Sequence, residues 1–543
     1  MNNYIKTLFA ATVLSMTASC TDLDVDVKSQ YTEYPTESEV ALEAKMADVY
    51  YAFRSALGNS YNRYQTFSSD EATGLSFDGD YYDGAENVNP TLHNFKAEDG
   101  SLNYWSDLSS GITRCNRTIS ELEASEANEM IDSYIASARV MRAFYHFILM
   151  DSYGDVPILN KIYDEDEAIV RSPRKEVAEF IEKEILEALP YLSVESNAAT
   201  YGKPNKWMAE ALLVKLYINW AVYTCGDVAT YDATTTQNSK LNDCVKYCDE
   251  IINSGLFNLS DEYRRKFMYD NGQQIADFIY AMPYDCINQQ GLLYGRYRTF
   301  RRIDDGSPIG YYGGEMINSC AGIVAMNPEF ADLFCLEGDD RNDAVLGGKV
   351  FVHDAISGEV TDVPYMYNDE QLEFTKTITL KAGGEEQLNA GADANGWRQG
   401  YRSIKFYPNP NEYSQYSRNQ SNDVPIFRYA DILLTKAEAI LRGATATGTD
   451  TPQSLFNQIR AYVNAPLLDH QPSLEELLDE RGREFFDESW RRNDMIRFGT
   501  FESEYGFHRQ DFPNAKFEKS RRIFPVPQDV LNENTNWEQN PGY

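Results

Sequence analysis

Residues 423–434 read Asp-Val-Pro-Ile-Phe-Arg-Tyr-Ala-Asp-Ile-Leu-Leu, with charged and aromatic residues alternating directly before an apolar run. The apolar spacing continues, which predicts a helix over 428–442. At its start Asp431 can cap the helix or pair with a cation, and Arg428 can pack over an aromatic ring. These residues therefore indicate a buried polar scaffold, and we assign them to the fold and not to a ligand.

A second charged stretch follows closely and favours the same interpretation. Its members are Arg481, Arg483, Glu484, Arg491, Arg492, Asp494 and Arg497. Guanidinium groups suit paired carboxylates, and an unpaired buried charge would be too costly. The stretch predicts a buried or half-buried lattice of ion pairs.

Working outward, the apolar spacing predicts helices that come in pairs. The ranges are 129–150 with 173–189, 204–224 with 240–254, and 428–442 with 452–464, followed by 474–486. Small residues such as Ala437 and Ala439 let paired helices approach closely. The pattern is typical of irregular helical-hairpin repeats near 34 residues long.

Residues 256–424 interrupt these repeats. The segment is rich in Gly, Tyr, Asn and Asp and lacks sustained helical spacing. A similar loop lies at residues 68–94 and contains Asp78-Gly79-Asp80-Tyr81-Tyr82-Asp83-Gly84. Because binding groups concentrate in loops on a rigid scaffold, we expect the functional site here.

The first residues indicate the compartment. Lys6 precedes an apolar run at 8–14 that is too short to span a bilayer, and small residues 17–19 lead into Cys20. This layout predicts a secretory signal at 1–19 and a lipidated Cys20, followed by a tether to residue 38. The alternative is an ordinary thiol at Cys20 beside an Ala-type cleavage site.

Composition narrows the function classes. The 543 residues carry a formal net charge of −35 at pH 7, which makes nucleic acid a poor partner. Tyr numbers 38, more than a core requires, so part of the Tyr set is expected on a working surface. Cys244 and Cys248 stand four apart on a predicted helix, and we interpret them as buried free thiols and not as metal ligands.

Catalytic motifs are absent from the sequence. It contains five His and lacks His-Glu-x-x-His, Gly-x-Ser-x-Gly and a phosphate-binding Gly-rich loop with Lys. His146 lies in an apolar helix and is interpreted as a core residue. A glycosidase needs two carboxylates across a cleft, and among 84 acidic residues the sequence favours no pair. We therefore predict a protein that is not an enzyme.

Several motifs in a fixed order resemble the SusD/RagB family of outer-membrane nutrient-binding lipoproteins over essentially the whole mature chain. They are the lipobox-like start, Trp105 with residues 114–117, residues 142–145 with 153–157, 423–434, 438–439, 481–486, 490–499, 524–527 and the terminal 539–543, Gln-Asn-Pro-Gly-Tyr. No single motif decides the matter, but their joint order is specific.

The resemblance implies a mainly helical SusD-like fold, in which tetratricopeptide-like hairpins form a scaffold and a loop-rich ligand-binding portion packs on it. The implied regions are an N-terminal helical part at 39–255 and a C-terminal part at 256–543. The latter comprises a loop-rich 256–424, a helical 425–503 and a final 504–543. The implied location is the outer membrane, lipid-anchored and surface-exposed, with a TonB-dependent SusC-like transporter as partner.

In that family the ligand is usually an oligosaccharide or polysaccharide, and a minority take peptides or other nutrients. Sugars need flat rings for stacking and planar polar groups for their hydroxyls. The candidate ligand-binding residues are Asp70, Asp80, Tyr81, Tyr82, Asn87, Tyr294, Arg296, Tyr297, Phe300, Asp304, Tyr311 and Tyr312. We expect no cofactor; whether calcium is bound, which glycan is recognised, and whether a peptide replaces it stay open.

Overall fold

The computed structural model describes residues 38–543 except 165, 294–321, 355–356, 358, 368, 408 and 410–418. The first helix is α2 (Glu39–Tyr50), and residues 46–543 form one compact unit. Within this unit the predicted pairs are present as α7 (Glu129–Tyr153) with α8 (Arg174–Ala188), α9 (Lys206–Ile218) with α11 (Leu241–Ser254), and α15 (Tyr429–Leu441) with α16 (Pro452–Tyr462). The mainly helical fold class is confirmed.

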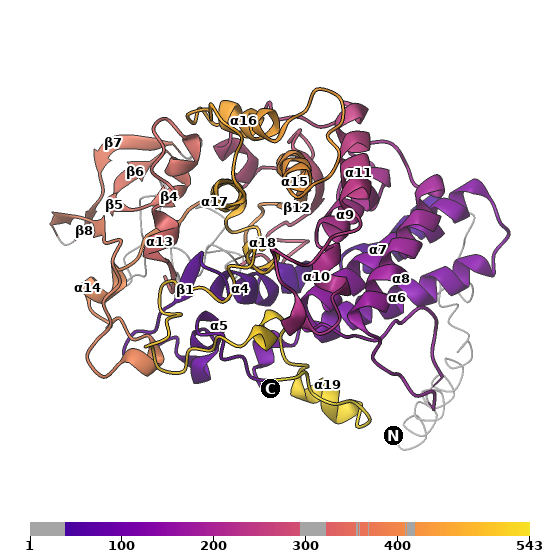
Figure 1. Cartoon of the computed structure of the whole chain (residues 1–543), viewed down its shortest axis with the longest axis horizontal. Coiled ribbons are helices and arrows are strands. Elements are labelled where there is room, and N and C mark those ends of the chain that lie inside the picture. The colour runs from indigo at the N-terminus through magenta and orange to yellow at the C-terminus, as the bar shows by residue number, and fades with distance from the viewer. Residues whose placement is uncertain are drawn as a thin grey trace, which may run out of the picture. The chain divides into compact units, whose positions relative to one another are not determined.

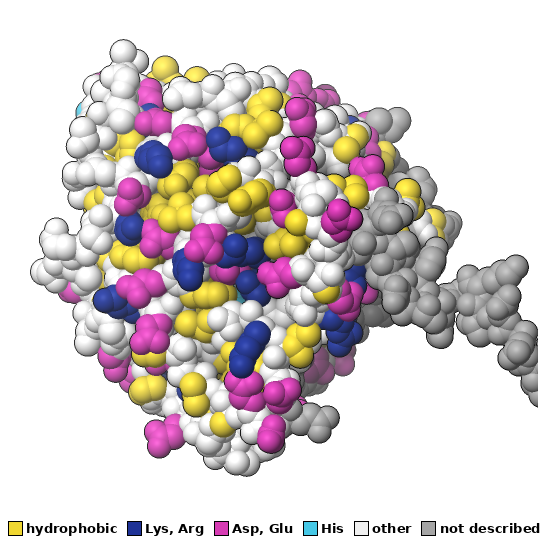
Figure 2. Space-filling model, turned by 90° about the vertical axis from the view of Figure 1, so that its right-hand side faces the viewer, with side chains coloured by type: hydrophobic (Ala, Val, Ile, Leu, Met, Phe, Trp, Pro, Cys, Tyr) yellow, Lys and Arg dark blue, Asp and Glu magenta, His cyan; other side chains and the backbone are white. Residues whose placement is uncertain are grey.

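Other helices extend this scaffold. They are α3 (Arg54–Leu57), α4 (Ser60–Phe67), α5 (Val88–Thr91), α6 (Trp105–Glu123), α10 (Trp220–Thr224), α13 (Pro328–Ala331), α14 (Ala394–Trp397), α17 (Leu474–Phe485), α18 (Arg491–Phe498) and α19 (Gln528–Glu533). The sequence analysis did not predict α6, which packs along α7. In Figure 1, α6, α7 and α8 lie together at one end, and Figure 2 shows that this end mixes apolar side chains with charges of both signs.

Local chemistry sets the helix ends. Asn128 accepts hydrogen bonds from the first-turn N–H groups of α7, and Ser473 forms a capping box with Glu476 at α17. Gly255 ends α11 with a φ of 67°. The range 204–224, predicted as one helix, is instead two helices separated at Asn219, whose amide donates to the Lys215 carbonyl at 2.9 Å. That side-chain bond competes with the helical ladder.

The strands are short and pair in twos throughout the described chain. They are β1 (Ala72–Gly74), β2 (Phe278–Met282), β3 (Val324–Met326), β4 (Val345–Leu346), β5 (Gly348–Lys349), β6 (Phe351–His353), β7 (Val360–Pro364), β8 (Met366–Tyr367), β9 (Glu370–Gln371), β10 (Glu373–Phe374), β11 (Arg402–Ser403) and β12 (Val424–Arg428). β12 pairs antiparallel with β2, so the opening motif begins as a buried strand before it becomes α15. Strands β4–β8 gather at the end of Figure 1 away from α6–α8.

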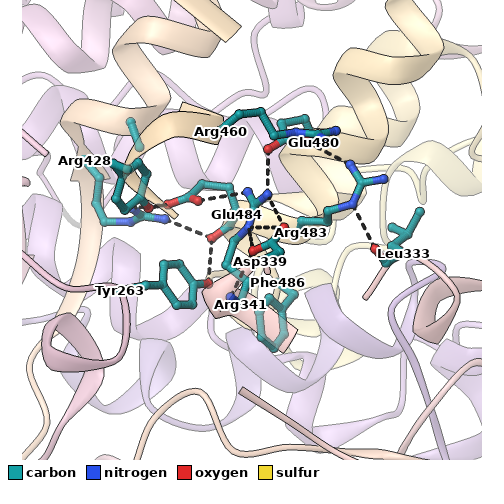
Figure 3. A network of polar contacts seen from close by, with 12 residues as sticks. Tyr263, Leu333, Asp339, Arg341, Arg428, Arg460, Glu480, Arg483, Glu484 and Phe486 are labelled. Carbon is teal, nitrogen blue, oxygen red and sulfur yellow. Dashed lines mark hydrogen bonds and ion pairs between the residues drawn. The ribbon is translucent and has the colours of Figure 1, made fainter. Parts of the chain in front are cut away.

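The predicted ion-pair lattice is confirmed around Arg428, which is 1% exposed. Its guanidinium donates to Asp277 at 2.6 Å, Glu484 at 2.8 Å and Glu488 at 2.8 Å. Arg341 donates to Glu480 at 2.7 Å and, like Arg428, to Glu484 (Figure 3). The fork shape of each guanidinium lets one cation bind several carboxylates, which joins β12, α17 and the loop before β4.

A second part of the lattice joins α15, α17 and α18. Arg481 binds Asp431 and Asp494, each at 2.8 Å, and Arg497 binds Glu438 and Asp494. Asp431 therefore pairs with a cation, and the Arg428 guanidinium lies 4.8 Å from the Phe485 ring centre, as predicted.

Arg492 differs from this prediction, because its guanidinium donates to backbone carbonyls. It donates to the backbone of Arg521 and Arg522 and packs over Phe524, without an ion pair among the described residues. The predicted core roles of other residues hold: Cys244 and Cys248 are buried free thiols, and burial lowers the pKa of His146 to about 4.

Candidate functional site

The candidate site is built on residues 76–87, here called the tyrosine loop, which connects β1 to α5. Phe77 and Asp80 exchange two backbone N–H···O bonds of 3.0 and 3.1 Å, which closes a tight hairpin. Asp78 and Gly79 occupy its corner with φ of 52° and 100°. Two consecutive positive φ values suit Asp-Gly turns, so the sequence Asp78-Gly79 directs the chain back on itself here.

The backbone beyond this corner is strained. Tyr81, Asp83 and Ala85 have φ of 61°, 42° and 76°, in a region that costs an L-residue roughly 1–2 kcal/mol. A bulky residue such as Tyr81 is rarely found there. Strain of this kind persists where surrounding contacts fix the chain, and it concentrates at ligand-binding sites.

Trp397 of α14 packs against two aromatic rings of the tyrosine loop. Its ring stacks on Phe77 with centroids 3.4 Å apart and meets the Tyr81 ring edge-on at 6.4 Å. The indole N–H donates to the Ala392 carbonyl at 3.0 Å, and the side chain is 2% exposed. Trp397 therefore forms a fixed floor that sets the angle at which Tyr81 is presented.

Asp78 fastens the loop from its other side. Its carboxylate accepts from Lys381 at 2.7 Å, from Asn389 at 3.1 Å and from the Ala392 N–H at 3.1 Å. The hydrogen bond from Lys381 is the main cause that lowers the pKa of Asp78 to about 2. The loop is thus tied to residues 381–397, although 300 residues of chain separate the two segments.

The predicted residues of this first region fall into two groups. Tyr81 and Tyr82 are half-buried and Asp80 is exposed, so all three are accessible. Asn87 is 1% exposed; its amide donates to the Tyr81 carbonyl at 3.1 Å while Arg63 donates to its oxygen. Asn87 therefore positions Tyr81 from below.

Asp70 makes a bidentate ion pair with Arg491, with both N···O distances 2.7 Å. The pair attaches the segment before β1 to α18. The carboxylate of Asp70 therefore has a structural partner within the protein. Ligand contact at Asp70 and Asn87 stays a prediction, as it does for the three accessible residues.

The second predicted region and the anchor lie outside the described residues. These residues are Cys20, Tyr294, Arg296, Tyr297, Phe300, Asp304, Tyr311 and Tyr312.

Further aromatic residues that were not predicted share an apolar cluster with the tyrosine loop. Tyr269, Tyr365, Tyr367 and Tyr401 are partly buried and pack on the same apolar cluster as Tyr81 and Tyr82. Periodicity could not reveal them, because they come from strands and loops far apart in the chain. The abundance of Tyr was the only signal available.

Metal and membrane-spanning features are absent from the described part of the chain. No group of three or more His, Cys, Asp or Glu side chains there is arranged to hold a metal ion. None of the helices described has the length and apolar character needed to cross a bilayer.

Two family models match this chain. One described as "SusD family" matches residues 365–543, and one described as "Starch-binding associating with outer membrane" matches residues 23–218. The Starch-binding protein SusD of Bacteroides thetaiotaomicron is 25% identical over 446 residues, which cover 75% of this chain and 72% of that protein.

Solved structures share the fold. A laminarin-binding SusD-like protein superposes with a TM-score of 0.69 at 21% identity, covering 93% of this chain and all of the other. Surface glycan-binding protein A from Bacteroides thetaiotaomicron, in complex with laminarihexaose, has a TM-score of 0.66 at 18% identity, covering 92% of this chain and 99% of that one. The family models, the curated relative and this common fold agree, and the chain belongs to the SusD/RagB family.

Proposed function

We propose that this chain is a non-catalytic glycan-binding lipoprotein of the outer-membrane surface, which passes its ligand to a TonB-dependent transporter. The observation that carries the proposal is the tyrosine loop, where a strained backbone presents the half-buried Tyr81 and Tyr82, with the Tyr81 ring edge-on to Trp397. Family membership adds support, since relatives include proteins named for binding starch and laminarin.

The chemistry of the loop suits sugar recognition. The C–H faces of a pyranose stack on aromatic rings, and carboxylates such as Asp80 accept bonds from its hydroxyls. Each ring face covered contributes roughly 1 kcal/mol at about 25 cal/mol per Å². After the cost of association this gives a Kd on the order of 10 μM to 1 mM, which allows release to a transporter.

The test uses residues 21–543 and a panel of neutral and acidic polysaccharides in affinity electrophoresis and calorimetry. We expect retardation by at least one glycan and its loss in Tyr81→Ala/Tyr82→Ala. Tyr191→Ala is the matched control, because Tyr191 is 55% exposed and lies at the end of α8. Equal binding by the loop variant, or binding of peptides alone, would reject the proposal.

Absence of catalysis needs its own measurement. Incubation with each bound glycan should leave chain length unchanged, because the proposed role is binding alone and the sequence lacks the catalytic motifs named above. Reducing ends released by wild type at more than the rate of the Tyr81→Ala/Tyr82→Ala variant would contradict a purely binding role.

The anchor and the partner are tested in cells. Mass spectrometry should find acyl chains on Cys20, and Cys20→Ala should release the protein from the membrane. For the transporter, the connection between α7 and α8 carries two exposed apolar side chains: Ile162 is 59% exposed and Val170 is 64% exposed. We expect Ile162→Glu/Val170→Glu to weaken co-purification of a barrel transporter while glycan binding is retained; unchanged co-purification would place the contact elsewhere.

A further inference from the structure

An open groove of about 370 Å³ lies beside α14, the helix that carries Trp397. One wall carries Thr375, Thr377 and Thr379, which alternate with the less exposed Lys376 and Ile378. The chain bends at Lys376 and Thr377, and the Thr375 hydroxyl donates to the Thr377 carbonyl at 3.0 Å, so a ligand would meet the hydroxyls of Thr377 and Thr379. The opposite wall carries Asn395, Arg398 and Gln399.

The amides of this groove are held in one orientation. The Thr379 N–H donates to the side-chain oxygen of Gln399, so the NH₂ group of Gln399 is the end left for another partner. Arg398 Nη2 donates to the side-chain oxygen of Asn395 at 2.6 Å, which likewise leaves the NH₂ of Asn395. Half of each amide is used to fix it, and the other half is available without a further ordering cost.

Arg398 itself is held by neutral groups. Its Nε donates to the Ala394 carbonyl at 3.1 Å, and among the described residues it makes no ion pair, in a chain of net charge −35. Glu373 brings one carboxylate to the same groove. The groove therefore combines planar donors, a planar acceptor, hydroxyls and methyl groups within one shallow surface.

This combination points to a ligand with neighbouring hydroxyls on a C–H framework. A hydroxyl pair both donates and accepts, so it can bind a guanidinium or carboxylate bidentately, while threonine methyls contact the ring carbons. A peptide would instead need unpaired backbone along a strand edge or apolar pockets for side chains. The groove is instead lined by hydroxyl, amide, guanidinium and carboxylate groups.

We propose that the groove is a second carbohydrate-binding subsite, which takes a sugar residue of the chain that also lies on Tyr81 and Tyr82. The inference rests on the proposed function. Residues 389–399 connect the two places: Asn389 binds Asp78, Trp397 packs on Tyr81, and the next two residues line the groove. A glycan of several residues can therefore reach both, and a short fragment reaches one.

Two linked contacts make a length-dependent prediction. When a ligand held at one place reaches the second, the second contact forms at high effective concentration and the affinities combine. The groove should therefore raise the affinity for long chains and leave that for di- and trisaccharides unchanged.

The experiment compares Kd values for a long and a short fragment of the same glycan, identified in the panel above. The first variant is Asn395→Ala/Arg398→Ala, and the second is Thr377→Val/Thr379→Val, which keeps the side-chain shape and tests the hydroxyls alone. Thr113→Val/Arg117→Ala on the exposed side of α6 is the matched control. We expect both groove variants to weaken long-chain binding roughly threefold to tenfold with unchanged short-chain binding and melting temperature.

The two proposals fail in different ways. Unchanged long-chain affinity in both groove variants, with loss in Tyr81→Ala/Tyr82→Ala, overturns the groove and leaves the proposed function standing. Equal weakening for long and short fragments also overturns it, because the groove would then act through the tyrosine loop and not as a second subsite. A wild-type chain that binds no glycan overturns both.

Discussion

The ion-pair lattice around Arg428 and the tyrosine loop differ in how their polar and aromatic side chains are placed. In the lattice, Arg428 is 1% exposed and forms ion pairs with three carboxylates. These charges are therefore neutralised within the protein, without a ligand. In the loop, Tyr81 and Tyr82 are half-buried on a backbone with repeated positive φ. The contrast separates charges that hold the fold from rings that are presented outward against a conformational cost.

The largest expected effect comes from breaking the lattice. Arg428→Ala leaves Asp277, Glu484 and Glu488 buried with one cation fewer, which should destabilise the protein by roughly 3–5 kcal/mol. Urea unfolding measures the loss. The control is Arg265→Ala, whose pair with Asp270 is largely exposed and should cost less than about 1 kcal/mol. Similar losses in the two variants would show that the lattice is not specially stabilising.

The next largest effect is expected from low pH, which should destabilise the protein by protonating the carboxylates of the lattice. Burial alone would raise the pKa of Asp277, but Lys266 and Arg428 together lower it to about 2, against about 3.9 in an unfolded chain. The lowered pKa contributes stability above pH 4, and this contribution of roughly 2–3 kcal/mol is lost as the pH falls towards 2. Nearby cations lower the pKa of Glu480 and Glu484 in the same direction.

Thermal unfolding between pH 7 and pH 2.5 checks this. The midpoint should fall mainly below pH 4, and Asp277→Asn should lower stability at pH 7 while flattening the fall. A midpoint that instead changes mainly between pH 5 and 7 would assign the pH dependence to groups other than these carboxylates.

How far the sequence predicts each region follows from what fixes it. Helices α7, α8, α11, α15, α16 and α17 were predicted because local spacing and caps decide them. Apolar residues of α6, among them Leu108, Ile112 and Ile119, follow the same spacing. This helix could therefore also have been predicted from the sequence. Ion pairing around Arg481 was predicted from charge density. The pairing of Arg341 with Glu480 and Glu484 was not, because these carboxylates lie about 140 residues away in the chain.

The loop shows where such reasoning stops. The loop predicted over 68–94 is present between β1 and α5, and accessible Tyr81 and Tyr82 were among the candidates. Asn87 was included for its polar side chain, yet it is buried beneath Tyr81, since only tertiary contacts decide the direction of a single amide. Trp397 lies about 320 residues from Phe77 in the chain, and no local pattern links the two.

A smaller effect is expected from relaxing the loop itself. Tyr81→Gly removes the cost of a positive φ but also the ring packed on Trp397, so the free energy of unfolding should change by less than about 1 kcal/mol. Glycan Kd should nevertheless rise about tenfold, because the stacking ring is lost. Calorimetry and urea unfolding of one preparation give both numbers. Large destabilisation with intact binding would make Tyr81 a packing residue, like those of the lattice.

The smallest expected effect comes from a substitution that tests whether the backbone strain of the tyrosine loop contributes to glycan binding. Ala85 has a φ of 76° and carries only a methyl group, so Ala85→Gly should stabilise the protein by roughly 0.5–1 kcal/mol, less the small apolar contact it loses. If the strained backbone orders Tyr81 and Tyr82 in advance, this gain in stability should be accompanied by weaker glycan binding, because the freed loop must be ordered by the ligand. If binding is unchanged while stability rises, the strain is a by-product of the tight turn and the ties through Asp78 and Trp397 suffice to present the rings.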